Sequence, residues 1–289
     1  MTLPPAKRFN RSVSPWTRCS VLPAVNLLPV RTDPSIRPSR RRLKRATERW
    51  LPLGENDMVA RITVLRHGGH ERPVIGRGAK HRRFRFSSIK TRTTQLGEGK
   101  GEEFLAFYNE VATDVVDYEC HPYQFEYMQH GKLRRYRPDS VRMLRNGSVQ
   151  LIECKRTPRD IADEEYRESL ACVAEIARMV GMQFSVLYLD DIFGTEERYR
   201  NVWGLFARRS MDLSAKEERA GRALAARGEA IEWGALRERL TPRDLLRGDA
   251  VIEAMLARGM LAADLDAKFT PRTILHPTRP FTGASEIRI

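Results

Sequence analysis

The chain has 289 residues, with 51 lysines and arginines against 37 aspartates and glutamates, a formal charge of +14, and 41% hydrophobic residues. This composition is typical of a folded globular protein of one or two domains. The sequence lacks the roughly 18 consecutive apolar residues of a membrane helix, and its four cysteines form no C-x-x-C pair. These features exclude a membrane span, argue against a zinc or disulfide framework, and favour the reduced cytoplasm.

The excess positive charge lies entirely in the first third of the chain. Residues 1–92 hold 22 basic and 5 acidic side chains, whereas residues 93–289 hold 29 and 32. Residues 1–57 are rich in proline and arginine and have no hydrophobic period, so we expect a disordered basic segment. Patterned sequence begins directly after Met58. This abrupt change favours a gene start assigned too far upstream, and the alternative is a genuine basic arm that binds DNA.

Arginine and phenylalanine alternate in the segment His81-Arg82-Arg83-Phe84-Arg85-Phe86. Alternation with period two predicts a strand with one basic face. Basic side chains on such a face can neutralise phosphates and give salt-sensitive affinity for DNA. The candidate DNA-binding residues are therefore Arg82, Arg83 and Arg85, together with the nearby Lys90.

The middle of the chain combines helical and strand patterns. Asn146-Gly147 stands between two apolar runs, which is a strong hairpin pattern. Helices are expected over residues 98–111 and 161–180. Strands are expected over residues 62–65, 115–118, 124–128, 141–144, 149–154 and 184–189. This order predicts an α/β sandwich around a mixed sheet, with the domain spanning residues 58–195.

A second unit is expected over residues 196–289. Thr241-Pro242-Arg243-Asp244 has the pattern of a helix start, with a capping residue and a proline. The expected helices cover residues 198–208, 213–228, 231–240 and 242–259, followed by two short strands at 260–261 and 272–275. Helices followed by a two-stranded wing are typical of a winged-helix domain, and the alternative is a helical cap on the first domain.

Charged residues gather at the end of one predicted strand. Glu153 and Lys155 are two residues apart, so they point the same way, about 7 Å apart. Asp139 begins the neighbouring strand of the hairpin and can lie beside Glu153. Because burying a glutamate and a lysine is costly, these residues predict a function. Two carboxylates with a lysine suit Mg²⁺ and the hydrolysis of a phosphodiester.

These residues, Pro138-Asp139 and Glu153-Cys154-Lys155, resemble the PD-(D/E)xK nuclease superfamily. Three upstream segments narrow the resemblance to the TnsA endonucleases of heteromeric transposons: Phe86-Ser87-Ser88-Ile89-Lys90, Glu98 to Leu105, and Val116 to Pro122. The sequence departs from that family at His121, Ser140, Gly99 and Gly101. Before the resemblance is considered, Glu102 is a surface acid in the first turn of a helix, and His121 before a proline is structural.

The resemblance implies a restriction-endonuclease-like core and a small winged-helix-like C-terminal domain. It assigns catalysis to Glu102, Asp139, Glu153 and Lys155, with metal ligation by the three acids among them. It implies Mg²⁺, for which Mn²⁺ can substitute, and cleavage of the 5′ ends of a transposon. The implied partners are DNA, a DDE-type transposase and an AAA+ ATPase that binds the C-terminal domain, in a cytoplasmic complex associated with the nucleoid.

Two alternatives remain at the level of the sequence. The first is a nuclease of restriction or phage type on the same fold, which would cut DNA without partners. The second is a DNA-binding assembly subunit without catalysis, in which the basic N-terminal region binds DNA and the acids are vestigial.

Overall fold

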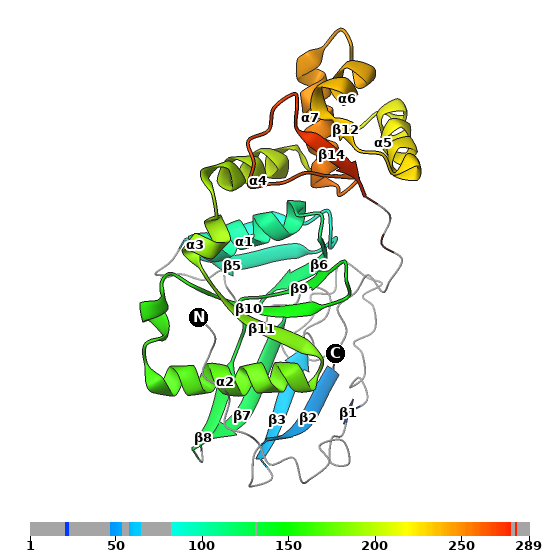
Figure 1. The fold of residues 1–289 in the computed structure, drawn as a ribbon. Helices are drawn as coiled ribbons and strands as arrows, with labels where there is room; N and C mark the ends of the chain where they lie inside the picture. The colour runs from blue at the N-terminus through cyan, green and yellow to red at the C-terminus, as the bar shows by residue number, and fades with distance from the viewer. Residues whose placement is uncertain are drawn as a thin grey trace, which may run out of the picture.

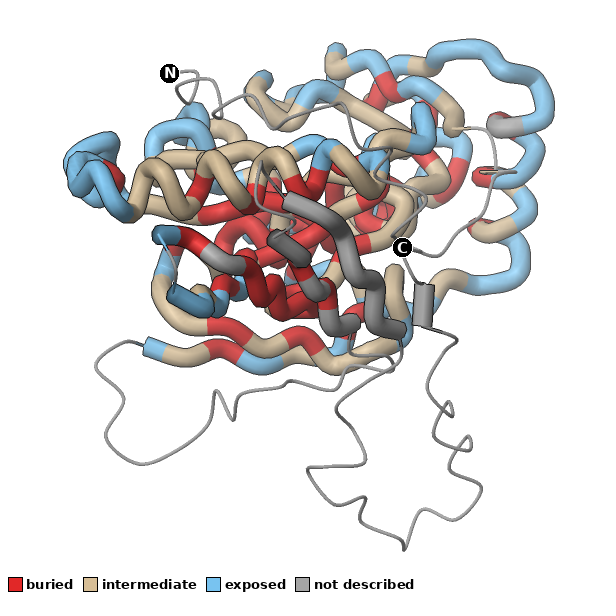
Figure 2. The backbone as a smooth tube through the Cα atoms, turned by 90° about the horizontal axis from the view of Figure 1, so that it is seen from below, coloured by how far each residue is buried: buried red, intermediate tan, exposed pale blue. Residues whose placement is uncertain are grey.

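The computed structural model describes residues 21–22, 47–53, 58–64, 82–130, 132–278 and 281. These residues form an α/β structure in which sheets and helices are layered, with a smaller unit of helices and short strands at one end (Figure 1). Buried backbone concentrates in the middle of the molecule, among the strands and the helices packed on them (Figure 2).

The central sheet has four strands in the order β11-β10-β9-β6. Their bounds are Val115–Cys120 for β6, Ser140–Leu144 for β9, Val149–Lys155 for β10 and Met182–Tyr188 for β11. β10 pairs parallel with β11 and antiparallel with β9, so the sheet is mixed, as predicted. The Asn146-Gly147 turn joins β9 to β10, and Gly147 takes a left-handed φ of 83° that favours glycine.

A second sheet has the order β1-β2-β3-β7-β8. Its strands are Val21–Leu22, Thr47–Leu53, Met58–Val64, Tyr123–Gln129 and Lys132–Tyr136. The expectation of disorder over residues 1–57 is wrong for β1 and β2, because β2 pairs with β3 along its whole length. Pairing with β3 satisfies the backbone hydrogen-bonding groups of β2. The sequence of this proline-containing segment has no hydrophobic period, so it did not predict the strand. Residues 1–20, 23–46 and 54–57 of that expected segment lie outside the described residues.

Helices cover both faces of the central sheet (Figure 1). α1 (Lys100–Val111) packs Phe104 against Ile152 of β10, and α2 (Glu164–Met179) packs Leu170 on the other side, in a cluster with Leu151. The hairpin of β4 (Arg83–Ser87) and β5 (Thr94–Glu98) precedes α1. Since Glu98 ends β5, α1 begins two residues later than predicted. α2 begins three residues later than predicted, because a short 3-10 helix, η1 (Pro158–Ile161), comes first and Asp163 caps α2.

The C-terminal unit is built from helices and three short strands. Its helices are α4 (Glu196–Arg208), α5 (Ala215–Arg227), α6 (Trp233–Leu240) and α7 (Leu245–Ala257), whereas the preceding α3 (Leu189–Phe193) packs on α1 and β11 of the core. β13 (Leu261–Ala262) and β14 (Ile274–Pro277) pair antiparallel, as predicted, and β12 (Ile231–Glu232) adds a third strand that the sequence pattern did not indicate.

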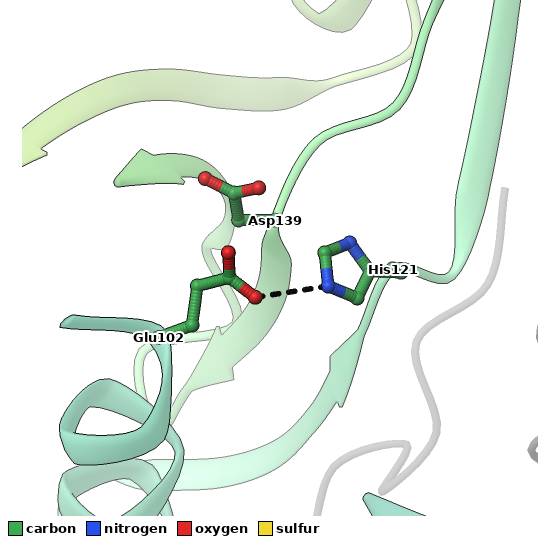
Figure 3. A group of neighbouring side chains, drawn as sticks. All are labelled: Glu102, His121 and Asp139. Atoms are coloured by element: carbon green, nitrogen blue, oxygen red, sulfur yellow. Dashed lines mark hydrogen bonds and ion pairs between the residues drawn. The ribbon is translucent and has the colours of Figure 1, made fainter. Parts of the chain in front are cut away.

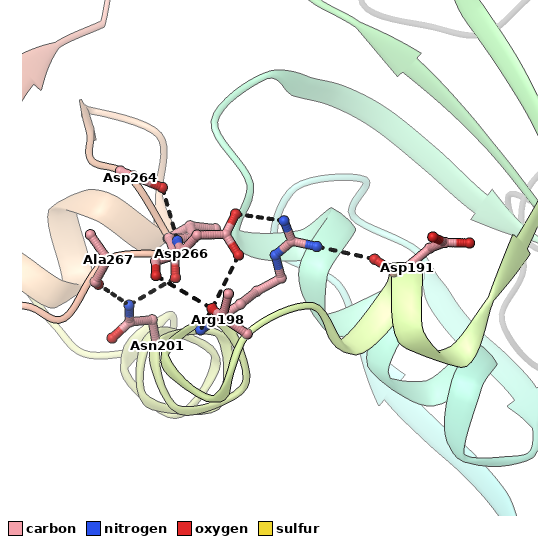
Figure 4. Close-up of polar contacts among 8 residues, drawn as sticks. Asp191, Arg198, Asn201, Asp264, Asp266 and Ala267 are labelled. Carbon is pink, nitrogen blue, oxygen red and sulfur yellow. Dashed lines mark hydrogen bonds and ion pairs between the residues drawn. The ribbon is translucent and has the colours of Figure 1, made fainter.

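Helix α4 joins the two parts of the molecule. The ring of Phe206 stacks on Phe107 of α1, with 3.8 Å between the ring centroids, and meets Phe86 of β4 edge-on. Toward the C-terminal unit, Arg198 forms an ion pair with Asp266 at 2.5 Å, and Asn201 donates to two carbonyl oxygens of the 265–267 turn (Figure 4). One apolar cluster therefore runs from α1 through α4 into α7.

None of the helices in the described part of the chain combines the length and the apolar composition that crossing a bilayer requires.

Candidate metal centre

Three side chains with metal-ligating atoms converge at one edge of the central sheet. Glu102 lies in the first turn of α1, His121 directly follows β6, and Asp139 directly precedes β9 (Figure 3). One ligand atom from each residue lies within 4.8 Å of the others. The Nε2 atom of His121 is 3.0 Å from Oε2 of Glu102. This group combines two carboxylates with an imidazole, which is a donor set for a divalent cation.

Tight packing around two glycines sets the position of Glu102. The backbone N–H of Glu98 donates to Oε2 of Glu102 at 3.0 Å, which holds the carboxylate against the end of β5. A Cβ on Gly97 would lie 2.3 Å from the ring of Phe84 and 2.9 Å from the same Oε2 atom, and a Cβ on Gly101 would lie 2.6 Å from Leu189. The glycine at 101, where the TnsA pattern differs, therefore allows α1 to approach α3 closely.

The backbone fixes the other two members of the group. His121 has a φ of 51°, in the left-handed region that is uncommon for residues other than glycine. Its N–H donates to the carbonyl of Asp139 at 3.0 Å, so the two residues are tied together. Asp139 Oδ2 accepts from the backbone N–H of Cys154 at 2.7 Å. Ser140 pairs with Ile152 in the β9–β10 register, so Asp139 lies beside Glu153, as predicted.

Glu153 and Lys155 lie at the end of β10, close to the group of three. Glu153 is 4% exposed, and its Oε2 atom accepts a hydrogen bond from the hydroxyl of Tyr136. Its Oε1 atom accepts from Lys155 Nζ at 2.5 Å and from the hydroxyl of Tyr166 at 2.8 Å. The ring of Tyr166 also lies 5.2 Å from the lysine ammonium. Because a carboxylate has about four acceptor positions, Glu153 retains capacity for one more ligand.

The concentration of acids at this edge changes the protonation of its members. Burial raises the pKa of Asp139 well above its usual value, and the charges of Glu153 and Glu102 raise it further. Burial alone would lower the pKa of His121, but its hydrogen bond to Glu102 and the charges of Glu102 and Asp139 outweigh burial and raise it. Converging carboxylates that hold a proton at a raised pKa also attract a divalent cation.

Lys155 remains a cation in this environment. Burial alone would lower the pKa of its ammonium, but the charge of Glu153 and the hydrogen bonds to Glu153 and Tyr166 outweigh burial and raise it. The ammonium of Lys155 is therefore a fixed positive charge beside the acids and does not act as a base at neutral pH.

A groove of about 840 Å³ opens beside these residues. Glu102 and Lys155 both line it, and Lys100 and Arg156 add positive charge to its lining. Further lining comes from Glu98, Gly99, Gly101, Cys154, Asp160, Tyr166 and Leu189. An extended anionic substrate that entered this groove would therefore meet Glu102 and Lys155 together.

The four candidate DNA-binding residues have different surroundings in the structure. Arg82 pairs with Glu103 of α1 at 3.2 Å, and Arg83 lies 3.9 Å from Glu98. Arg85 is exposed on β4, opposite the buried Phe84, as the predicted alternation requires. Lys90 turns inward, and its Nζ atom donates to the carbonyl oxygens of Asn109, Ala112 and Val115 at 2.6, 2.7 and 2.9 Å.

The Phe86-Ser87-Ser88-Ile89-Lys90 segment has a structural role around the buried Glu110 of α1. Glu110 accepts hydrogen bonds from the Ser88 hydroxyl at 2.5 Å, the Tyr118 hydroxyl at 2.7 Å and the backbone N–H of Ile89 at 2.8 Å. Together with the contacts of Lys90, these bonds hold the β4–β5 hairpin against the C-terminal half of α1. The segment therefore supports the helix that carries Glu102.

No protein-family model matches the chain, and no curated protein matches it either. The case for a function therefore depends on the geometry of this site.

Sequence analysis selected Glu102, Asp139, Glu153 and Lys155, and the structure brings all four to one edge of the sheet. It treated His121 as structural, whereas the imidazole lies within the metal-ligating group. The pattern Cys120-His121-Pro122 directly after a predicted strand was the available indication, because the end of a strand beside Asp139 is where the site lies.

Proposed function

We propose that the protein is a metal-dependent DNA endonuclease that serves as the 5′-end-cleaving subunit of a heteromeric transposase. The observation that carries this proposal is the convergence of Glu102 and Asp139 with His121, within 4.8 Å, beside the Glu153–Lys155 pair. This arrangement at the end of a mixed sheet supports a nuclease core of the PD-(D/E)xK kind. The resemblance to TnsA endonucleases in the sequence narrows the proposal to transposition.

The residues present fit a divalent cation. Glu102 and Asp139 supply carboxylate oxygens, and Glu153 has acceptor capacity left at the end of β10. A bound Mg²⁺ or Mn²⁺ would polarise the scissile phosphate and lower the pKa of a water molecule at this edge. Asp139 would have to be deprotonated to bind this cation, because its raised pKa reflects a proton that competes for the same oxygen atoms.

Lys155 supplies the second element of the proposed chemistry. Its ammonium is held by Glu153 and lies over the ring of Tyr166, so its position is set before a substrate arrives. A charge that is already oriented stabilises the negative charge that develops on the phosphate without further reorganisation. Lys155 therefore acts electrostatically, because its raised pKa keeps it protonated.

The C-terminal unit supports an assembly role. We propose that α5, α6, α7 and the β12-β14-β13 sheet form a winged-helix-like domain that binds the AAA+ ATPase of the transposition complex. Residues 196–289 hold 17 basic and 14 acidic side chains, so this unit has no strong excess of positive charge for binding phosphates. The DDE-type transposase would cut the 3′ ends, while this chain cuts the 5′ ends.

The test is strand cleavage of DNA that carries the transposon ends, in the presence of the DDE-type transposase and the AAA+ ATPase encoded by the same transposon. Asp139→Asn and Lys155→Ala should each lower the rate of 5′-end cleavage by about 10²- to 10³-fold, the usual effect of removing one such stabilising group. Asp190→Asn and Lys268→Ala are matched controls, since both residues are exposed and lie outside the group of three. Parental cleavage by Asp139→Asn would overturn the proposal, and cleavage without the partners would favour a stand-alone nuclease.

A further inference from the structure

The imidazole of His121 lies in the proposed metal site, so a role for it as a ligand rests on the proposed metal-dependent function. His121 contributes Nε2 to the same group as the carboxylates of Glu102 and Asp139 (Figure 3). Its side chain is 20% exposed and that of Glu102 is 19% exposed, so both face a sheltered edge that a hydrated ion can still reach.

The position of His121 is imposed by the fold. A left-handed φ at a residue other than glycine is strained and persists only where the surroundings hold it. At φ 51° His121 is held by its N–H bond to the carbonyl of Asp139 and by the buried Pro122 that follows it. The backbone therefore holds His121 beside Asp139, and the contact of Nε2 with Glu102 Oε2 places the imidazole within the group.

Donor chemistry distinguishes the divalent cations. Mg²⁺ takes oxygen ligands and keeps several waters, whereas imidazole nitrogen suits transition metals and raises their affinity relative to Mg²⁺. A site made only of oxygen ligands suits both Mg²⁺ and Mn²⁺. One imidazole beside two carboxylates shifts the preference toward the transition metal.

We propose that His121 is a direct metal ligand through Nε2 and that it makes the site select Mn²⁺ over Mg²⁺. In the structure the Nε2 atom shares a hydrogen bond with Glu102 Oε2 at 3.0 Å. A cation bound between them replaces this contact and uses the same two atoms.

The chain offers a matched control for this histidine. His130 also has a φ of 51° and its Nε2 lies 2.6 Å from a glutamate oxygen, that of Glu168. His130 is exposed and is not part of the metal-ligating group. A change at His130 therefore removes a histidine–glutamate pair of the same kind without touching the site.

The experiment measures binding of Mn²⁺ and of Mg²⁺ to the full chain by calorimetric titration, without DNA. We expect Mn²⁺ to bind at least about tenfold more tightly than Mg²⁺, a difference of about 1.4 kcal/mol. His121→Gln, which offers an amide oxygen, should remove most of the tenfold ratio of Mn²⁺ to Mg²⁺ affinity, because it weakens the binding of Mn²⁺ alone. His130→Gln should leave this ratio unchanged. An unchanged ratio in folded His121→Gln overturns the proposal.

A second measurement needs no variant. Electron spin echo modulation of Mn²⁺ bound to the parental protein reports coupling to ¹⁴N when an imidazole is a ligand, and its absence would refute ligation by His121. The outcomes also separate this inference from the proposed function. If Asp139→Asn abolishes metal binding and cleavage while His121→Gln keeps the ratio, only the role of His121 fails. If Asp139→Asn retains both, the proposed nuclease site itself is wrong.

Discussion

Replacing Lys90 with methionine tests whether this lysine supports the fold or binds DNA. The sequence placed Lys90 among the DNA-binding candidates, whereas in the structure its Nζ atom donates three hydrogen bonds to carbonyl oxygens at the C-terminal end of α1 and the start of β6. Methionine has nearly the same length but has no donor. The substitution therefore removes the three bonds and leaves the packing of the side-chain stem in place.

The magnitude follows from these contacts. Three hydrogen bonds at about 1 kcal/mol each, together with a favourable cation at a helix C-terminus worth about 0.5 kcal/mol, give about 3.5 kcal/mol. Burial opposes the charged amine, as shown by the lowering of the pKa of Lys90 to about 7, and methionine removes that cost. We therefore expect Lys90→Met to lower the free energy of unfolding by about 2 kcal/mol, which is about 5 °C in Tm for a chain of this size.

The assay combines thermal unfolding with DNA binding at several salt concentrations. Lys268→Met is the matched control, because Lys268 is exposed and loses the same charge. A structural Lys90 predicts a lower Tm and a salt dependence of DNA affinity equal to that of the control. A phosphate contact would instead reduce the salt slope by about 0.9 with no change in Tm. That second result would refute the structural role of Lys90.

Three further predictions concern the site and the packing of α4. Gly97→Ala should displace Glu102 or Phe84 and lower the free energy of unfolding by about 1–3 kcal/mol. It should also weaken metal binding in a titration, and an unaltered metal affinity would show that packing against Gly97 does not position Glu102. Because the pKa of Asp139 is raised, protons compete with a cation for its carboxylate, so the Tm increase caused by Mn²⁺ should be larger at pH 8 than at pH 5; equal increases would exclude Asp139 as a ligand. Asn201→Ala should accelerate amide hydrogen exchange in the 264–267 turn, since two carbonyl oxygens lose their donor; unchanged exchange would mean that apolar packing alone holds the turn.

The sequence by itself determined the strand end that carries the proposed chemistry. Residues two apart on a strand share a face, and an Asn-Gly turn sets the register of its hairpin, so both rules act over short stretches of chain. They placed Glu153 and Lys155 together and Asp139 beside them, and the β9–β10 pairing confirms that placement. The alternation of arginine and phenylalanine likewise predicted β4.

Only the tertiary structure decided which distant side chains complete the site. Glu102 and His121 are 19 residues apart in the sequence, and their contact depends on how closely α1 packs on the sheet. Two glycines and the hydrogen bonds that Glu110 accepts control this packing distance. The inward turn of Lys90 and the stacking of α4 on α1 depend on the same packing. Periodicity reports which face of an element is apolar, but not which partner covers that face. For this reason the sequence left His121 as a structural residue and Lys90 as a surface cation.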